Sequence, residues 1–148
     1  MINVLVSACL LGVDCRYDGK NCFNEDILKL KDKCNLIPIC PEQMGGLATP
    51  RVPAEIVDGK LINKEGKDVT NQYNKGREIA LKVANINNCK YAILKQKSPS
   101  CGYGVIYDGS FSGKLIDGNG HTAKLLVENG IKVYADNNIK EFIDELKL

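Results

Sequence analysis

Seven cysteines are spread along this chain of 148 residues, and their thiols are the side chains best suited to metal binding or to thiol chemistry. Cys9, Cys40 and Cys101 each follow a short apolar run that is typical of a strand. The carboxyl ends of parallel strands meet at one edge of a sheet, so we expect these three thiols to converge there. Thiolates select zinc, copper(I) or iron–sulfur clusters, and the pattern therefore predicts a soft metal centre.

The other four cysteines fall into two groups. Cys34 and Cys89 lie just before predicted strands, at the opposite edge, and we expect both to be buried and inert. Cys15 and Cys22 lie in a polar loop near the predicted centre, where each is either a fourth ligand or a bystander. The chain has no close Cys-x-x-Cys pair, which disfavours a zinc ribbon and favours a larger object such as a cubane cluster. Three ligands around four irons leave one iron open as a Lewis acid.

Polar residues beside these cysteines are candidates for the rest of a site. Glu42 lies two residues after Cys40 in a segment rich in proline and glycine, and a carboxylate beside a metal is a natural general base for water. Ser98 and Ser100 stand just before Cys101 and are candidate hydrogen-bond donors to a ligand.

Arginine and histidine are scarce. Arg16 and Arg51 are two of only three arginines, and both fall in the cysteine-bearing loops, which favours pairing with a carboxylate or positioning of a substrate. His121 is the only histidine and starts a predicted helix. We interpret it as structural, because a histidine metal site needs partners that this chain lacks.

The elements that position these residues are predicted to alternate between strands and helices. Apolar runs predict strands at 2–6, 36–39, 91–94 and 131–134, and helical spacing or caps predict helices at 25–33, 70–88, 122–129 and 138–146. The alternation predicts an α/β fold of the three-layer Rossmann-like kind, a mostly parallel sheet with helices on both faces. We expect one domain over residues 1–148.

Connecting segments and helix caps are predicted from local chemistry. The segment 41–53 holds three of the five prolines and is expected to be an extended, shaped loop, while 54–63 is expected to be a hairpin and 105–120 a ribbon. The expected helix caps are Asn24, Asp68 or Thr70, and a capping box from Asn138 to Glu141.

Composition narrows the class of partner. The net charge is +2 and no dense Lys/Arg run is present, so we expect no nucleic-acid partner. No window approaches eighteen consecutive apolar residues, so we expect no membrane partner and a cytoplasmic protein. An odd count of cysteines in a reducing compartment argues against a disulfide framework. The expected partner is a small molecule, and the sequence makes no prediction of oligomeric state.

Several short strings together resemble a bacterial and archaeal family long catalogued as a domain of unknown function, whose characterised members are thiouracil desulfidases. The strings are SACLLG at 7–12, CRYDG at 15–19, CPE at 40–42, GGL at 45–47, PR at 50–51 and SPSCG at 98–102. The resemblance implies a [4Fe-4S] cluster with Cys9, Cys40 and Cys101 as its ligands and a fourth iron open for the substrate sulfur.

The same resemblance implies a non-redox desulfuration of a thiolated pyrimidine or related thioamide, which releases uracil and hydrosulfide. Glu42 would activate water, and Ser98 would hydrogen-bond the ring or relay a proton. Ser100, Gly46 and Arg51 are expected to bind the substrate. The chain has no GxxxxGK[ST] string, in agreement with a reaction that uses no nucleoside triphosphate.

Two other functions fit the cysteine pattern. An open-iron hydro-lyase of aconitase type would share the cluster but would need a pair of carboxylate-binding arginines beside it. A non-catalytic zinc or iron–sulfur carrier would have no use for Glu42 or Ser98. For the leading function, a free base, a nucleoside and a thioamide outside the pyrimidines all fit the sequence as substrates.

Overall fold

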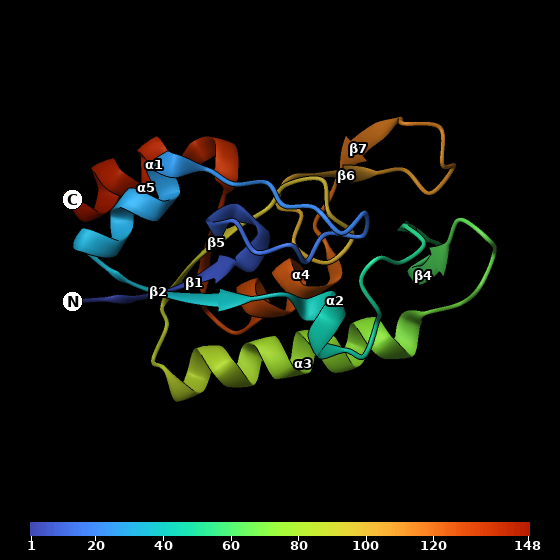
Figure 1. The fold of residues 1–148 in the computed structure, drawn as a ribbon, viewed down its shortest axis with the longest axis horizontal. Coiled ribbons are helices and arrows are strands. Elements are labelled where there is room, and N and C mark those ends of the chain that lie inside the picture. Colours follow the sequence, from blue (N-terminus) through green and yellow to red (C-terminus); the bar gives the residue numbers. More distant parts are fainter.

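A computed structural model describes residues 1–148, and its centre is a sheet of four parallel strands (Figure 1). The strands are β1 (Asn3–Ser7), β2 (Asn35–Ile39), β5 (Tyr91–Leu94) and β8 (Lys132–Ala135). Their order is β2-β1-β5-β8, and each neighbouring pair is parallel. Pro38 lies in β2, which is an edge strand, as a residue without a backbone donor requires.

Helices cover both faces of the sheet, because successive strand side chains point to opposite sides. Val4, Val6 and Ile93 pack on one face against α1 (Glu25–Leu28) and α5 (Ile139–Leu146). Leu5 and Leu94 pack on the other face, against α3 (Thr70–Ile86) and α4 (His121–Glu128). Figure 1 shows α3 on one side of the sheet and α1 with α5 on the other. The predicted three-layer α/β fold is confirmed.

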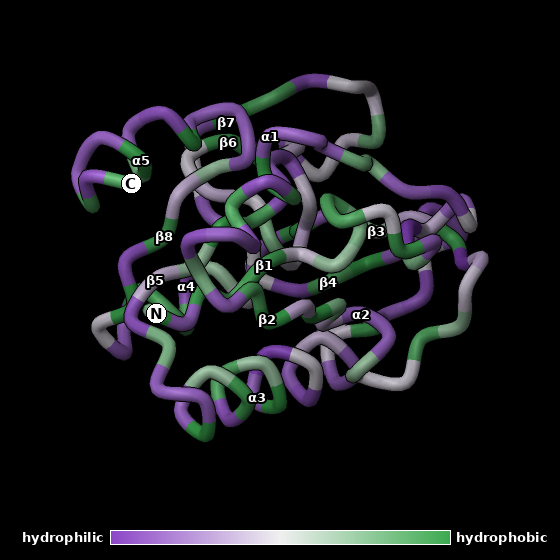
Figure 2. Tube along the Cα trace, turned by 60° about the vertical axis from the view of Figure 1, so that its left-hand side comes forward, coloured by the Kyte–Doolittle hydropathy of each residue, from purple (hydrophilic) through white to green (hydrophobic).

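Hydropathy along the long helix explains how it docks on the sheet. Its buried residues are Tyr73, Gly76, Ala80 and Ala84, spaced three or four apart. Such spacing places them on one face of the helix. Figure 2 shows hydrophobic and hydrophilic positions alternating with the turns of α3.

Two antiparallel pairs lie beyond the carboxyl ends of β1 and β2 (Figure 1). They are the hairpin of β3 (Ala54–Val57) with β4 (Lys60–Asn63) and the ribbon of β6 (Val105–Tyr107) with β7 (Leu115–Asp117). Oε1 of Glu55 in the hairpin accepts hydrogen bonds from the N–H groups of Gly109 and Phe111 at the ribbon tip, at 2.9 and 3.2 Å. Both pairs were predicted, and this link between them joins segments far apart in the chain.

Local expectations for the connections and caps are confirmed in part. The segment 41–53 was expected to be a loop, but it begins with the one-turn helix α2 (Pro41–Met44). Proline suits the first turn of a helix because its φ is preset and it has no N–H to satisfy, and the loop prediction was wrong there. The first predicted helix shortens to α1 and continues as the 3-10 helix η2 (Lys29–Asp32).

Two of the three predicted caps make a side-chain bond to the backbone. Asn24 accepts a hydrogen bond from the Ile27 N–H at 3.2 Å. Asp68 accepts one from the N–H of Thr70, the first residue of α3, at 2.9 Å, although Val69 stands directly before the helix. Asn138 precedes α5 but makes no cap bond to the backbone, because its amide donates to the Glu141 carboxylate. The remaining short helices are η1 (Ala8–Leu11) and η3 (Asp136–Asn138).

The order of the strands creates a crevice at the point where the chain changes direction. After β1 the chain adds β2 on one side, and it later adds β5 on the other side of β1. The loops that leave β1 and β5 therefore separate, and open α/β sheets bind ligands at such a switch point. No helix is both long enough and apolar enough to cross a bilayer.

Candidate active site and metal centre

A cavity of about 550 Å³ opens at the switch point. Cys9, Cys40 and Cys101 all line it, although they leave three different strands. Cys15 and Cys22 line it as well. The predicted convergence of thiols at one edge of the sheet is confirmed, and so is the exclusion of the two remaining cysteines, Cys34 and Cys89, which are buried elsewhere.

The first thiol is fixed by a tight turn at the end of β1. The chain enters η1 directly after the strand, and Gly12 closes it in the left-handed region with φ 94°. The Cys9 carbonyl accepts from the N–H groups of Gly12 at 3.3 Å and Cys22 at 2.9 Å. The polar loop that carries Cys15 is thereby folded back over the strand end, where Cys15 is 2% exposed.

The segment from Ser98 to Cys101 is held by its own serine and by α4. Ser98 Oγ accepts from the N–H groups of Ser100 at 3.2 Å and Cys101 at 3.0 Å. The first N–H groups of α4, which lack partners within the helix, donate to the carbonyls of Pro99 and Ser100. A Cβ on Gly120 would lie 2.6 Å from the Ser100 carbonyl carbon, so this close approach requires glycine.

Glu42 lies on α2 at the centre of a hydrogen-bonded network. Its Oε1 accepts from Arg51 Nε at 3.0 Å and from the Tyr73 hydroxyl at 2.9 Å. Its Oε2 accepts from Ser100 Oγ at 2.9 Å, and Ser98 Oγ lies 3.0 Å from Ser100 Oγ. Because Ser98 Oγ already accepts two backbone N–H bonds, its own proton is free to point to Ser100. The result is a directed chain of hydroxyls that ends on the carboxylate.

Arg51 is almost wholly engaged by the protein. Besides Glu42, it donates through Nη1 to the Ala48 carbonyl and Thr49 Oγ1, and through Nη2 to the Cys15 carbonyl. Its side chain is 8% exposed. Of the two predicted roles for this arginine, pairing with a carboxylate is the one that the structure contains.

Arg16 and Gly46 were also singled out in the sequence. Arg16 pairs with Asp18 at 3.3 Å and donates to Cys22 Sγ at 2.7 Å, so it also holds a carboxylate. Gly46 follows α2 in the left-handed region and is not among the residues that line the cavity.

Burial keeps several of these thiols protonated when no metal is bound. Burial raises the pKa of Cys101 to about 12, although Ser7 and Ser100 oppose the shift. The hydrogen bond with Cys40 lowers the pKa of Cys15, but the bond with Cys9 and burial outweigh it, so the value is about 11. The bond with Cys15 and burial raise the pKa of Cys40 well above its usual range. A metal group bound by these thiols would therefore displace their protons.

The thiols around the cavity are a donor set that fits a [4Fe-4S] cluster. No three of the His, Cys, Asp and Glu side chains are placed to hold one metal ion. The thiols instead surround a cavity with room for a polynuclear group, and thiolates are the usual ligands of iron–sulfur clusters. Cys9 and Cys101 are 9% and 5% exposed, which gives such a group a largely dry setting.

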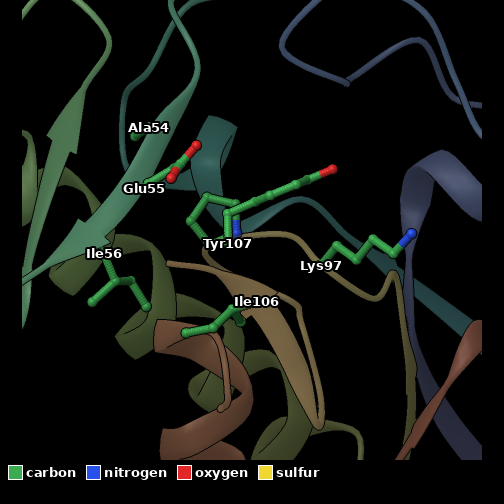
Figure 3. A pocket seen from close by; sticks show the side chains of 7 residues that line it. Ala54, Glu55, Ile56, Lys97, Ile106 and Tyr107 are labelled. Carbon is green, nitrogen blue, oxygen red and sulfur yellow. The ribbon is translucent and has the colours of Figure 1, made fainter. Parts of the chain in front are cut away.

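Some residues of the cavity escaped the sequence interpretation. Lys95, Lys97 and Tyr107 line it, and Lys95 pairs with Asp136 at 3.6 Å. Lys97 and Tyr107 also border a narrow crevice between the hairpin and the ribbon, where their polar ends extend in a similar direction, away from Ile56 and Ile106 (Figure 3). The loops that bring these residues together carry no motif of their own.

His121 and Tyr73 lie behind the cavity. His121 hydrogen-bonds Asn74 of α3 and does not line the cavity, in agreement with a structural role. Tyr73 lies within the helix predicted at 70–88, and no role in the site was predicted for it. A buried tyrosine hydroxyl usually has a polar partner, and that was the one signal in the sequence for its contact with Glu42.

Comparisons with known proteins gave matches over most of the chain. The model of the 2-thiouracil desulfurase family matches residues 4–138. The uncharacterized protein YbbK of Bacillus subtilis (strain 168) is 43% identical over 150 residues, which cover 95% of this chain and 99% of that protein. A solved structure of the [4Fe-4S]-dependent thiouracil desulfidase TudS (DUF523Vcz) is 38% identical, with a TM-score of 0.94 over 99% of both chains.

Proposed function

Because the chain belongs to the 2-thiouracil desulfurase family, we propose that it replaces the sulfur of a thiouracil-like pyrimidine by oxygen without net electron transfer. It is accordingly an enzyme, a [4Fe-4S]-dependent desulfidase. One water is consumed, its oxygen becomes the carbonyl oxygen of uracil, and the sulfur leaves as hydrosulfide. The observation that carries the proposal is the meeting of several thiols with the Ser98–Ser100–Glu42 chain at one cavity.

Three thiols would hold the cluster. Cys9, Cys40 and Cys101 are the proposed ligands, because each leaves a different rigid strand of the sheet. When bound, the cluster supplies a Lewis-acidic iron for the thiocarbonyl sulfur. Cys15 contacts both Cys9 and Cys40, and it is the one other buried thiol of the cavity. Cys15 is therefore the alternative to Cys40 as the third ligand.

Glu42 would act as the general base. Its carboxylate lines the cavity and accepts three hydrogen bonds, so it is already oriented to take a proton from water. Ser100 bonds to the same carboxylate oxygen that would receive the proton, and Ser98 continues the chain. The two hydroxyls would return a proton from Glu42 to the leaving sulfur or to a ring nitrogen.

Contacts with the substrate would come from residues that line the cavity. Ser98 and Ser100 both line the cavity and can reach a pyrimidine edge. Arg51 is proposed to support binding through Glu42, since its donors are largely spent on protein atoms. Gly46 remains the least supported of the predicted contacts, because it lies outside the lining of the cavity.

The aconitase-type alternative is disfavoured by the arginines. A hydroxy-acid substrate needs free guanidinium groups, whereas Arg51 is bound to Glu42 and Arg16 to Asp18. A non-catalytic carrier would have no use for the hydrogen-bonded network around Glu42.

Anaerobic purification and reconstitution, with iron and acid-labile sulfide analysis, test the proposal together with a 2-thiouracil turnover assay. The expected result is four irons and four sulfides per chain, formation of uracil and release of hydrosulfide. A stoichiometric zinc site with no labile sulfide would refute both cluster enzymes. Glu42→Gln is expected to keep the cluster and lose turnover, and a fully active variant would remove Glu42 from the mechanism.

A further inference from the structure

Tyr73 reaches the Glu42 carboxylate from behind the cavity. It is 3% exposed on α3 and is not among the cavity-lining residues. Its hydroxyl donates to Glu42 Oε1 at 2.9 Å, the oxygen that also accepts from Arg51 Nε at 3.0 Å. Oε1 is therefore held by two donors, whereas Oε2 bonds only to Ser100, which lines the cavity.

Backbone contact between two helices brings Tyr73 and Glu42 together. A Cβ on Gly76 of α3 would lie 1.9 Å from the Pro41 carbonyl oxygen, and a Cβ on Gly45 would lie 1.9 Å from the Gln72 carbonyl oxygen. Residues three apart share a helix face, so Tyr73 stands beside Gly76 and Glu42 stands beside Gly45. The two polar side chains therefore meet at the crossing of α2 with α3.

A one-turn helix is a weak support for a reacting group. Helix α2 spans only Pro41–Met44, and a glutamate has three rotatable side-chain bonds. Burial and the charge of Glu42 raise the pKa of Tyr73 far above its ordinary value, so the phenol stays a neutral donor at working pH. It therefore offers Oε1 a permanent hydrogen bond from a rigid, buried ring.

We infer that Tyr73 is a positioning residue of the proposed desulfidase, which fixes Oε1 so that Oε2 and Ser100 face the reacting atoms. The inference rests on the proposed function. Tyr73 does not itself line the cavity and contacts the site only through Glu42. Loss of its hydroxyl therefore lowers kcat through misplacement of Glu42 and leaves the KM for thiouracil unchanged. If the Tyr73 hydroxyl only made a hydrogen bond within the core, its loss would lower the free energy of unfolding and leave kcat unchanged.

The variant Tyr73→Phe tests this inference in the reconstituted enzyme. We expect kcat per cluster to fall by about 10-fold, with KM within about two-fold of wild type and unchanged iron and labile sulfide. Tyr134→Phe is the matched control, because the Tyr134 hydroxyl also bonds a glutamate, Glu145, on α5 away from the cavity. Its kcat and KM should equal those of wild type.

A crystal structure of Tyr73→Phe provides a readout that does not depend on activity. The expected result is a rotated Glu42 carboxylate that has lost its contact with Ser100. An unchanged carboxylate with kcat within about two-fold of wild type overturns the inference, as does a loss of iron that matches the loss of turnover. Absence of turnover in wild type would overturn the proposed function, and the carboxylate position would then decide the inference by itself.

Discussion

Nη2 of Arg51 lies 2.8 Å from the carbonyl oxygen of Cys15, a residue 36 positions earlier in the chain. Because Nε of the same guanidinium binds Glu42 at 3.0 Å, one side chain joins the Cys15 loop to the helix of the proposed base. Arg51→Ala should lower the free energy of unfolding of the metal-free protein by about 3 kcal/mol, since it removes the cation beside a carboxylate that is only 13% exposed. Urea denaturation measures the change.

Arg16→Ala is the control for that measurement. Arg16 and Asp18 are each about 30% exposed, and the loss of such a pair should cost less than about 1 kcal/mol. Equal effects of the two substitutions would show that Arg51 contributes no more than a surface ion pair.

Cluster content should separate ligands from bystanders. Cys9→Ala, Cys40→Ala and Cys101→Ala are each expected to lose iron and labile sulfide after anaerobic reconstitution, because a cluster held by three thiolates does not survive the loss of one. Cys34→Ser and Cys89→Ser, at buried sites away from the cavity, should keep both.

Cys15→Ala is the decisive comparison, because Cys15 contacts both Cys9 and Cys40. The proposed ligand set predicts that this variant keeps its cluster. Loss of the cluster in Cys15→Ala together with its retention in Cys40→Ala would exchange the roles of these two residues.

Ser100→Ala should break the hydroxyl chain between Ser98 and Glu42. The substitution removes the donor to Glu42 Oε2 and leaves the neighbouring thiol intact. We expect kcat for thiouracil to fall about 100-fold with cluster content unchanged. Ser110→Ala, at the exposed tip of the ribbon, should leave kcat unchanged. A Ser100→Ala enzyme with wild-type kcat would exclude the relay.

The glycine contact between α2 and α3 should tolerate no side chain. Gly76→Ala ordinarily stabilises a helix by up to about 1 kcal/mol, but here the methyl group meets the Pro41 carbonyl. We expect a net destabilisation of about 2 kcal/mol or more and reduced turnover, because α2 must move. Lys75→Ala, on the exposed side of the same turn, should change stability by less than about 0.5 kcal/mol.

His121 should make stability depend on pH in the mildly acidic range. Burial, followed by the charges of Arg77 and Lys124, lowers its pKa to about 4. The unfolded chain, with an ordinary histidine, binds the proton first, so stability is complete above about pH 6.5 and falls as the pH drops toward 4. Because the ring is only partly buried, the loss is limited to about 1–2 kcal/mol.

His121→Gln isolates this contribution, because carboxylates titrate in the same range in both proteins. The difference in unfolding free energy between wild type and variant should shrink as the pH is lowered from 6.5 to 4. A constant difference across that range would show that His121 does not carry the effect.

The alternation of strands and helices along the sequence predicted both the parallel sheet and the meeting of three thiols at one of its edges. Apolar runs that alternate with helical segments imply parallel strands, and parallel strands bring Cys9, Cys40 and Cys101 to one edge. The same alternation correctly removed Cys34 and Cys89 from the site. These predictions needed only the direction of each strand.

The parts that the sequence did not predict depend on contacts between distant segments. Helix α2 was taken for a loop because proline and glycine surround it, although proline also suits a first turn. The Tyr73 contact arises where α2 crosses α3. Asn138 matched a capping box, but its amide binds the Glu141 side chain instead of serving the backbone. Periodicity within one element does not determine such pairings.

The scattering of the thiols over three strand ends also sets an order of events during biogenesis. A Cys-x-x-Cys pair can bind iron while the chain is still leaving the ribosome. Three cysteines on separate strand ends, Cys9, Cys40 and Cys101, become neighbours only once β1, β2 and β5 have paired. With the proposed ligand set, the newly made chain would therefore fold first, as a metal-free protein with protonated thiols, and would accept its cofactor afterwards through the mouth of the finished cavity.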